Sequence, residues 1–169
     1  MYSDFHLAEI NIARALAPMD SPLMADFLPL IPPVNDLADR SDGFVWRLQS
    51  EYGDATGIRA FDDAAFLVNM SVWRDIESLR AFTYATDHLI PFRARRKWFE
   101  PPTFAHVALW WIPAGTIPTL QDGKDRLDLL AALGPTPHAF TFKQPFGPDG
   151  APLDPERGAR RLIEPPLAP

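Results

Sequence analysis

Hydrophobic and polar residues alternate over residues 5–16, which predicts a β-strand. Its even-numbered side chains fall on one face, and its odd-numbered ones, which include Glu9 and Asn11, fall on the other. Alternating or continuous apolar runs predict further strands over residues 43–49, 64–73, 104–112 and 138–142. Residues 64–73 and 104–112 are apolar on both faces, which is typical of central strands covered on both sides.

Helices are predicted between these strands. Apolar residues recur every three or four positions over residues 23–40, where Pro29, Pro32 and Pro33 should kink or split the helix because proline cannot donate the helical hydrogen bond. Three further helices are predicted: one capped by Asp75, one from Pro91 to about Phe99, and one over residues 119–133. The order β-α-β-β-α-β, followed by a helix and an extra strand, indicates an α+β fold of the ferredoxin-like, split-βαβ type.

Both faces of the predicted sheet are apolar, although the helices of this plan cover only one of them. The sheet of a second subunit would cover the other face, so we expect a homodimer. Proline makes up seven of the 25 residues from Pro145 onward. We therefore expect a domain over residues 1–144 and a proline-rich C-terminal arm over residues 145–169, which either wraps a partner subunit or is loose.

Composition excludes several classes of function. The chain has 169 residues, a net charge of -6 and no cysteine, so disulfides, zinc thiolates and thiol catalysis are ruled out. Its one basic cluster, Arg93, Arg95, Arg96 and Lys97, is too small to bind nucleic acid on an otherwise acidic surface. No run approaches the ~20 apolar residues of a membrane span, and no signal-peptide pattern is found, so we expect a cytoplasmic protein without membrane contact.

Metal and cofactor motifs are not found either. His6, His88, His106 and His138 are scattered, without a His-x-x-x-His pair or a cluster of acidic ligands. Gly-rich phosphate loops and the nucleophile elbow of serine hydrolases are missing as well. We therefore expect no metal and no cofactor. Aromatic residues, in contrast, make up 12% of the chain, and such side chains often line pockets for small molecules.

Five segments carry a resemblance to a known family: GFVWRL (43–48), SVW (71–73), RKWF (96–99), WWIPAG (110–115) and GPTPHAFTF (134–142). They resemble a bacterial family of unknown function, numbered 3291, over roughly residues 4–143. That family is similar to the antibiotic-biosynthesis monooxygenases, which are dimeric α+β barrels. The resemblance implies a pocket between sheet and helices. Some of these relatives act without a cofactor on polycyclic phenols, some degrade haem, and some have no known activity.

His88 is the candidate catalytic residue. It follows the helix capped by Asp75, where monooxygenase-like relatives often have a histidine, and an imidazole suits a general base near neutral pH. The alternative is a histidine that satisfies backbone groups where the helix ends. Haem-degrading relatives use a strand asparagine, a histidine and a tryptophan. Asn11 fits the first, but Phe82 stands at the tryptophan position and His88 comes too early, so haem is the least favoured ligand.

The candidate substrate-binding residues are Asn11, Trp46, Arg47, Trp73, Arg96 and Trp110. Phe44, Trp46 and Leu48 share one face of the strand over residues 43–49, and Arg47 lies on the other. An arginine on a half-buried strand face needs an anion, which comes either from the protein or from a ligand.

The remaining candidate residues can also be interpreted in two ways, as ligand contacts or as structural residues. Arg96 either clamps a carboxylate or phosphate group, together with Arg93 and Lys97, or belongs to a surface face. Such a face is solvated or is paired with acids such as Asp87 and Glu100. The tryptophans either line a pocket or fill the core. Trp110 and Trp111 must point to opposite faces of their strand, so at most one of them lines a given pocket.

Three kinds of function are compatible with these features. The first is a cofactor-independent, monooxygenase-like enzyme that acts on an aromatic or polyketide-like substrate, with His88 as the base. The second is a binding or sensing module with the same pocket for a small aromatic ligand and no chemistry. The third is a structural dimer whose pocket is filled by side chains. The resemblance favours the first.

Overall fold

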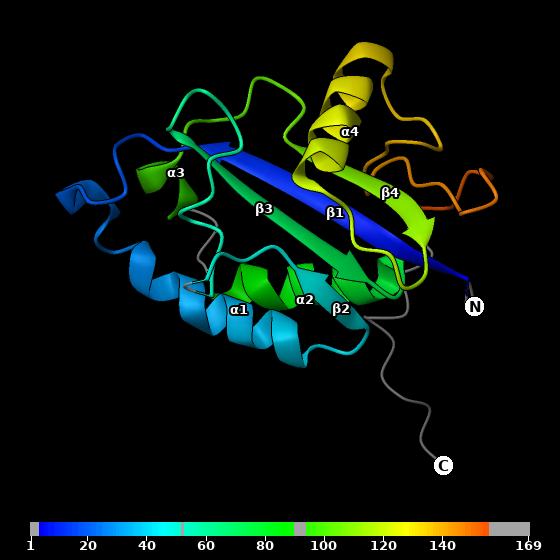
Figure 1. Ribbon diagram of the computed structural model, residues 1–169, viewed down its shortest axis with the longest axis horizontal. Helices are drawn as coiled ribbons and strands as arrows, with labels where there is room; N and C mark the ends of the chain where they lie inside the picture. The colour runs from blue at the N-terminus through cyan, green and yellow to red at the C-terminus, as the bar shows by residue number, and fades with distance from the viewer. Residues whose placement is uncertain (1–3, 52, 90–93, 156–169) are drawn as a thin grey trace.

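A computed structural model describes the protein over residues 4–51, 53–89 and 94–155, with the backbone alone for residues 85–89. Four antiparallel strands form one sheet in the order β2-β3-β1-β4 (Figure 1). The strands are β1 (Phe5–Arg14), β2 (Phe44–Arg47), β3 (Phe66–Trp73) and β4 (Val107–Pro113). The helices are α1 (Ile31–Arg40), α2 (Ile76–Leu89), α3 (Arg95–Trp98) and α4 (Leu120–Leu133), with 3-10 turns η1 (Pro22–Met24) and η2 (Leu28–Leu30). The α+β class and the split-βαβ element order are thus confirmed.

Local sequence explains where the helices begin. The predicted helix over residues 23–40 is broken into η1, η2 and α1, with Pro29 in η2 and with Pro32 and Pro33 in the first turn of α1, where a helix tolerates proline. Asp75 caps α2, because its Oδ1 accepts a hydrogen bond of 2.8 Å from the Ser78 N–H. Thr119 caps α4 in a reciprocal capping box with Asp122. None of the described helices is long and apolar enough to cross a membrane.

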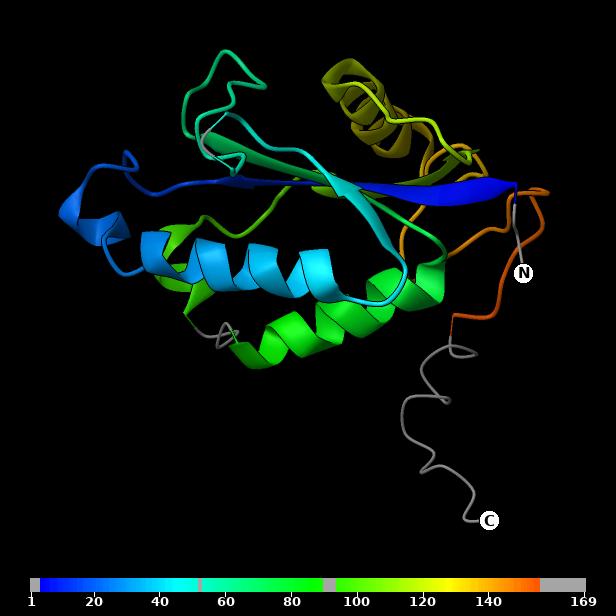
Figure 2. The ribbon, with the colours of Figure 1, turned by 60° about the horizontal axis from the view of Figure 1, so that its bottom comes forward.

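Helices of this chain cover both faces of the sheet, contrary to our expectation. Figure 2 shows α1 and α2 on one side of the sheet and α4 on the other. Gly123 lets α4 approach closely, because a Cβ atom there would lie 2.7 Å from Ile10 Cδ1 and 2.9 Å from Met70 Sδ. The predicted homodimer is therefore not needed to bury the second face, and it stays a prediction.

Each face of the sheet has its own apolar cluster. Under α4, even-numbered strand residues pack together with α4 side chains: Ala8, Ile10, Ile12, Val68, Met70, Val72, Ala108, Trp110, Ile112, Leu127 and Leu130. Under α1 and α2 the cluster is smaller and rich in aromatic rings. Its buried members are Leu7, Ala38, Trp73, Ile76, Leu79, Leu109 and Phe140. The predicted separation of Trp110 and Trp111 onto opposite faces is confirmed.

Two local predictions were wrong. Phe44 packs on the α1/α2 side, whereas Trp46 packs under α4, because the register of β2 shifts between them and breaks the alternation. Residues 138–142 form no strand of several residues. Phe140 instead makes a single bridge to Leu109 of β4, with N–H···O distances of 2.9 and 2.8 Å.

The described start of the proline-rich segment, residues 145–155, packs onto the domain. The Trp111 Nε1–H donates to the Phe146 carbonyl at 2.7 Å, and Phe146 contacts the aromatic cluster. The buried Arg80 donates through Nη1 to the Pro155 carbonyl at 2.8 Å, and its guanidinium lies 5.4 Å from the Phe142 ring centroid. Residues 156–169 of the predicted arm lie outside the described residues.

Candidate active site

A cavity of about 420 Å³ lies between the sheet and the layer formed by α1 and α2. The odd-numbered residues of the two central strands face it, because side chains alternate along a strand. They include Glu9, Asn11, Asn69, Ser71 and Trp73. The cavity thus has a polar floor formed by the sheet. Its walls are mostly apolar and aromatic side chains of the helices.

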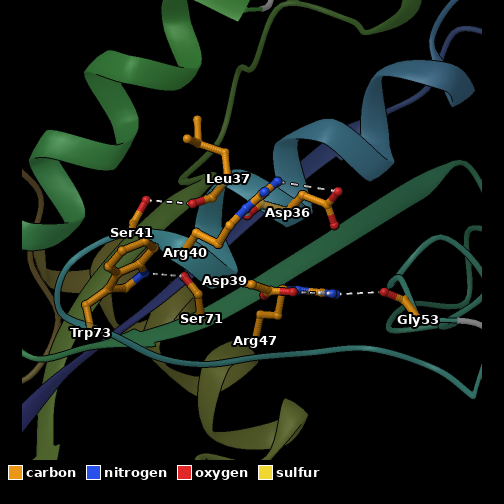
Figure 3. A network of polar contacts seen from close by, with 9 residues as sticks. All are labelled: Asp36, Leu37, Asp39, Arg40, Ser41, Arg47, Gly53, Ser71 and Trp73. Atoms are coloured by element: carbon orange, nitrogen blue, oxygen red, sulfur yellow. Dashed lines mark hydrogen bonds and ion pairs between the residues drawn. The ribbon is translucent and has the colours of Figure 1, made fainter.

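Glu9 is the buried carboxyl of this floor, with 7% of its surface exposed. The Asn11 Nδ2–H donates to Glu9 Oε1 at 2.7 Å, and the Ser71 hydroxyl donates to Oε2 at 3.0 Å. Ser71 in turn accepts a hydrogen bond of 2.9 Å from the Trp73 indole N–H (Figure 3). Each Glu9 oxygen keeps lone-pair capacity beyond these bonds, since a carboxylate offers about four acceptor sites.

Burial raises the pKa of the Glu9 carboxyl from 4.5 to about 7, although the hydrogen bonds from Asn11 and Ser71 act in the opposite direction. A carboxyl whose pKa is raised in this way can change its protonation state near neutral pH. It can therefore accept a proton from a ligand and return it, which is the property required of a general base or acid.

Asn69 lies directly across the sheet from Asn11 and is exposed to the cavity, although β3 is a central strand. Among the described residues, none forms a hydrogen bond with its amide. A free amide offers two N–H donors and an acceptor oxygen to whatever enters the cavity. Asn69 is thus available to a ligand, whereas Asn11 is committed to Glu9.

Aromatic rings form the walls beside this polar floor. Trp73 stacks on Phe82 of α2 at 4.9 Å between centroids and 26° between planes, and meets Phe44 edge-on at 5.3 Å. Near α3, Phe27 packs against Trp98 at 5.5 Å and against Phe99 at 5.0 Å. Walls of this kind favour flat, largely apolar ligands.

Arg47 also lines the cavity, but its donors are engaged by the protein. Nε and Nη2 donate to the two Asp39 carboxylate oxygens at 2.8 and 3.2 Å, and Nη1 donates to the Gly53 carbonyl at 2.7 Å (Figure 3). The arginine thereby fastens α1 and the loop after β2 to the sheet. This geometry favours the protein-anion reading of Arg47 over the ligand reading.

A family model for a domain of unknown function, DUF3291, matches residues 6–155. The chain belongs to this family. The match covers both central strands, all four helices and the docked segment after residue 144. No curated protein matches the sequence.

Two solved proteins are similar to this DUF3291 chain at low identity. SnoaB, a cofactor-independent oxygenase from Streptomyces nogalater, is 19% identical with a TM-score of 0.42, over 69% of this chain and 99% of that chain. A protein of unknown function from Nitrosomonas europaea is 12% identical with a TM-score of 0.40, over 69% and 98%. Likenesses this remote carry no inference about the reaction.

The residues singled out from sequence are divided between different parts of this DUF3291 domain. Asn11, Arg47 and Trp73 line the cavity. Trp46 and Trp110 lie on the α4 side of the sheet, and Arg96 is exposed on α3 outside the cavity. His88 belongs to α2, but its side chain lies outside the described residues.

Sequence reasoning missed several cavity residues, above all Glu9, Asn69 and Arg95. The signal for Glu9 was present, because a glutamate on a strand with apolar neighbours on both sides needs a special environment. Asn69 carries the same signal in the middle of the apolar run 64–73. Neither pattern alone says which face of the sheet holds a cavity.

Proposed function

We propose that this protein is an enzyme that removes a proton from a flat aromatic or polyketide-like small molecule, with Glu9 as the base. The observation that carries the proposal is a buried carboxyl that opens onto the cavity and is held there by hydrogen bonds from Asn11 and Ser71. Burial raises its pKa to about 7, which suits proton transfer. A carboxyl whose pKa is raised by burial costs stability, and such a cost is tolerated most often at functional sites. Glu9 thus replaces His88 as the proposed base.

The neighbouring groups suit such a proton transfer. Ionised Glu9 takes a proton from a phenolic O–H or an acidic C–H of the substrate, while Asn11 and Ser71 hold its oxygens in place. Negative charge then develops on the conjugated substrate oxygen. The Asn69 amide has no hydrogen-bond partner among the described residues, so it can donate to that oxygen and stabilise the anion.

A cofactor-independent, monooxygenase-like reaction would begin with the same step. For an anthrone, removal of a C10 proton gives a carbanion that transfers an electron to O2. Recombination at C10 gives a hydroperoxide, which loses water to form the quinone. The balance is one anthrone and one O2 to one anthraquinone and one water, so the substrate itself supplies all the electrons. Glu9 supports the first step of this sequence.

The test uses dithranol, a hydroxylated anthrone, as the substrate probe. We expect Glu9→Gln to slow oxygen uptake and quinone formation by about 10²–10⁴-fold, the usual contribution of a general base. Glu51→Gln, at an exposed loop glutamate, is the matched control and should keep the wild-type rate. Exchange of the C10 protons in deuterated water under nitrogen isolates the proton transfer from the oxygen step. Equal exchange rates for wild type and Glu9→Gln would refute Glu9 as the base.

A binding or sensing module without chemistry is the second candidate. The aromatic walls and the free Asn69 amide favour it independently of Glu9, since both would recognise a flat ligand with a hydrogen-bonding group. Saturable binding of dithranol under nitrogen, with no exchange and no oxygen uptake above the uncatalysed rate, would favour this role over the enzyme.

A further inference from the structure

A second charged group faces the cavity from α3. Arg95 belongs to this four-residue helix and lines the cavity, whereas its neighbour Arg96 does not. The helix is fixed to the end of β1, because the Leu16 N–H donates to the Trp98 carbonyl at 2.8 Å and the Glu100 N–H donates to the Arg14 carbonyl at 2.9 Å. The buried Trp98 side chain adds a packed anchor. The backbone of α3 is therefore fixed at this end of the cavity, and Arg95 lies exposed at the cavity edge.

Among the described residues, Arg95 has no anionic partner, whereas Arg14 and Arg47 do. Arg47 is bound by Asp39, and Arg14 forms ion pairs with Asp63 and Glu100. Within the described part of the chain, no carboxylate pairs with Arg95. A guanidinium with free donors at the edge of a cavity fits a planar anion, because its fork of N–H groups matches the two oxygens of a carboxylate.

Glu9 and Arg95 lie toward different ends of the same cavity. Ala13, the last β1 residue that lines it, is four residues from Glu9, which corresponds to about 13 Å along a strand. The α3 helix lies just beyond Ala13, beside Ala15 and Leu16. An elongated molecule that lies along β1 can therefore contact both groups, with its acidic proton at Glu9 and its anionic group at the α3 end.

We propose that Arg95 is a specificity-determining residue that selects elongated aromatic substrates bearing a carboxylate at the end remote from the reacting proton. The proposal rests on the proposed function for the position of that proton at Glu9. It assigns the two charged groups different tasks. Glu9 exchanges the proton, and Arg95 sets the register of the substrate along β1.

Two probes of nearly the same shape separate these tasks. 4′-Hydroxybiphenyl-4-carboxylate carries a phenol and a carboxylate at opposite ends, and 4′-hydroxybiphenyl-4-carboxamide replaces the charge with a neutral amide. Their dissociation constants are measured by titration calorimetry at pH 7.5 with the full chain. The variants are Arg95→Gln and Arg96→Gln, which remove one positive charge each from the same short helix.

We expect the wild-type protein to bind the carboxylate about tenfold more tightly than the carboxamide, or better, since a charge-assisted pair contributes at least this much. Arg95→Gln should bring the ratio to about one, with the carboxamide affinity unchanged within about twofold. Arg96→Gln should keep the wild-type ratio. Equal wild-type affinities for the two probes would overturn the proposal, as would an equal loss in both variants, because the effect would then be one of net charge.

The dithranol assay keeps the two proposals apart. Dithranol has no carboxylate, so the effect of Glu9→Gln on its turnover tests the base alone. Wild-type protein that turns over dithranol through Glu9 but shows no carboxylate preference would retain the proposed function and lose the role of Arg95. Failure of both probes to bind would overturn the Arg95 proposal as well.

Discussion

The two faces of the sheet use the same strands for opposite purposes. On the α4 side, even-numbered residues such as Ile10 and Met70 are fully buried in an apolar cluster. On the α1/α2 side, their odd-numbered neighbours Glu9 and Asn69 face a cavity of about 420 Å³. One sheet can therefore hold a polar site inside the domain while its other face is fully packed. We call the α4 side the closed face and the α1/α2 side the open face. Packing on the closed face stabilises the domain, so the open face can carry groups that cost stability.

The largest expected contrast comes from adjacent residues of β3. Met70→Ala removes a side chain with no exposed surface from the closed face, and we expect a loss of about 2–5 kcal/mol in the free energy of unfolding. Asn69→Ala changes a side chain that faces the cavity without a described partner, and we expect a change within about 0.5 kcal/mol. Urea denaturation at pH 7 measures both. Similar losses of unfolding free energy in the two variants would contradict the inference that the α4 side of the sheet supplies the stability and the α1/α2 side holds the site.

The second contrast concerns charge and pH. The folded protein binds a proton at Glu9 up to about pH 7, whereas the unfolded chain releases it near its ordinary pKa of 4.5. The folded state thus holds more protons between these values, so Glu9 makes the protein less stable as pH rises from about 4.5 to 7, with no further change above. A shift of this size corresponds to a cost on the order of 3 kcal/mol.

Glu9→Gln should remove this cost. We expect the free energy of unfolding of Glu9→Gln to rise relative to that of wild type as the pH increases from 4.5. Above pH 7 this difference should reach a plateau. Denaturation series at pH 4.5, 6, 7 and 8 provide the measurement. A difference that is independent of pH would mean that Glu9 titrates alike in the folded and unfolded states.

Much of the fold could be predicted from local patterns. Alternation along residues 5–16 placed Glu9 and Asn11 on one face of a strand, and the apolar runs marked the two strands beside it. The prolines of residues 23–40 correctly predicted a broken helix. These features depend on neighbours in sequence, so the sequence alone reveals them.

The remaining features depend on contacts between distant segments. The place of α4 over the second face follows from the fit of Gly123 against Ile10 and Met70, which no local pattern contains. The role of Glu9 depends on the space left between the sheet and two helices. Arg95 and Arg96 are adjacent arginines, and no sequence pattern favours either as a cavity residue. In the structure Arg95 lines the cavity and Arg96 does not. Site prediction therefore required the tertiary arrangement.

The smallest expected effect tests how tightly the closed face is packed. Gly123→Ala should gain about 1 kcal/mol from helix propensity and lose about 1–3 kcal/mol from overpacking, because the new Cβ meets Ile10 Cδ1 and Met70 Sδ inside a fully buried cluster. We expect a net destabilisation of about 1 kcal/mol. Gly57→Ala is the matched control. Its Cβ would meet no atom within 4 Å and its φ is not in the left-handed region, so we expect a gain of about 0.4–1 kcal/mol.

Opposite signs for these two glycine variants in urea denaturation would show that the closed face tolerates no added methyl group. A stabilising Gly123→Ala would instead mean that the ends of Ile10 and Met70 move aside at little cost. The close approach of α4 would then be incidental, and the closed face would be less rigid than the even-numbered residues of β1 and β3 imply. The polar site on the opposite face would then be stabilised by other contacts in the domain. One such contact is the Arg47–Asp39 ion pair, which fastens α1 to the sheet.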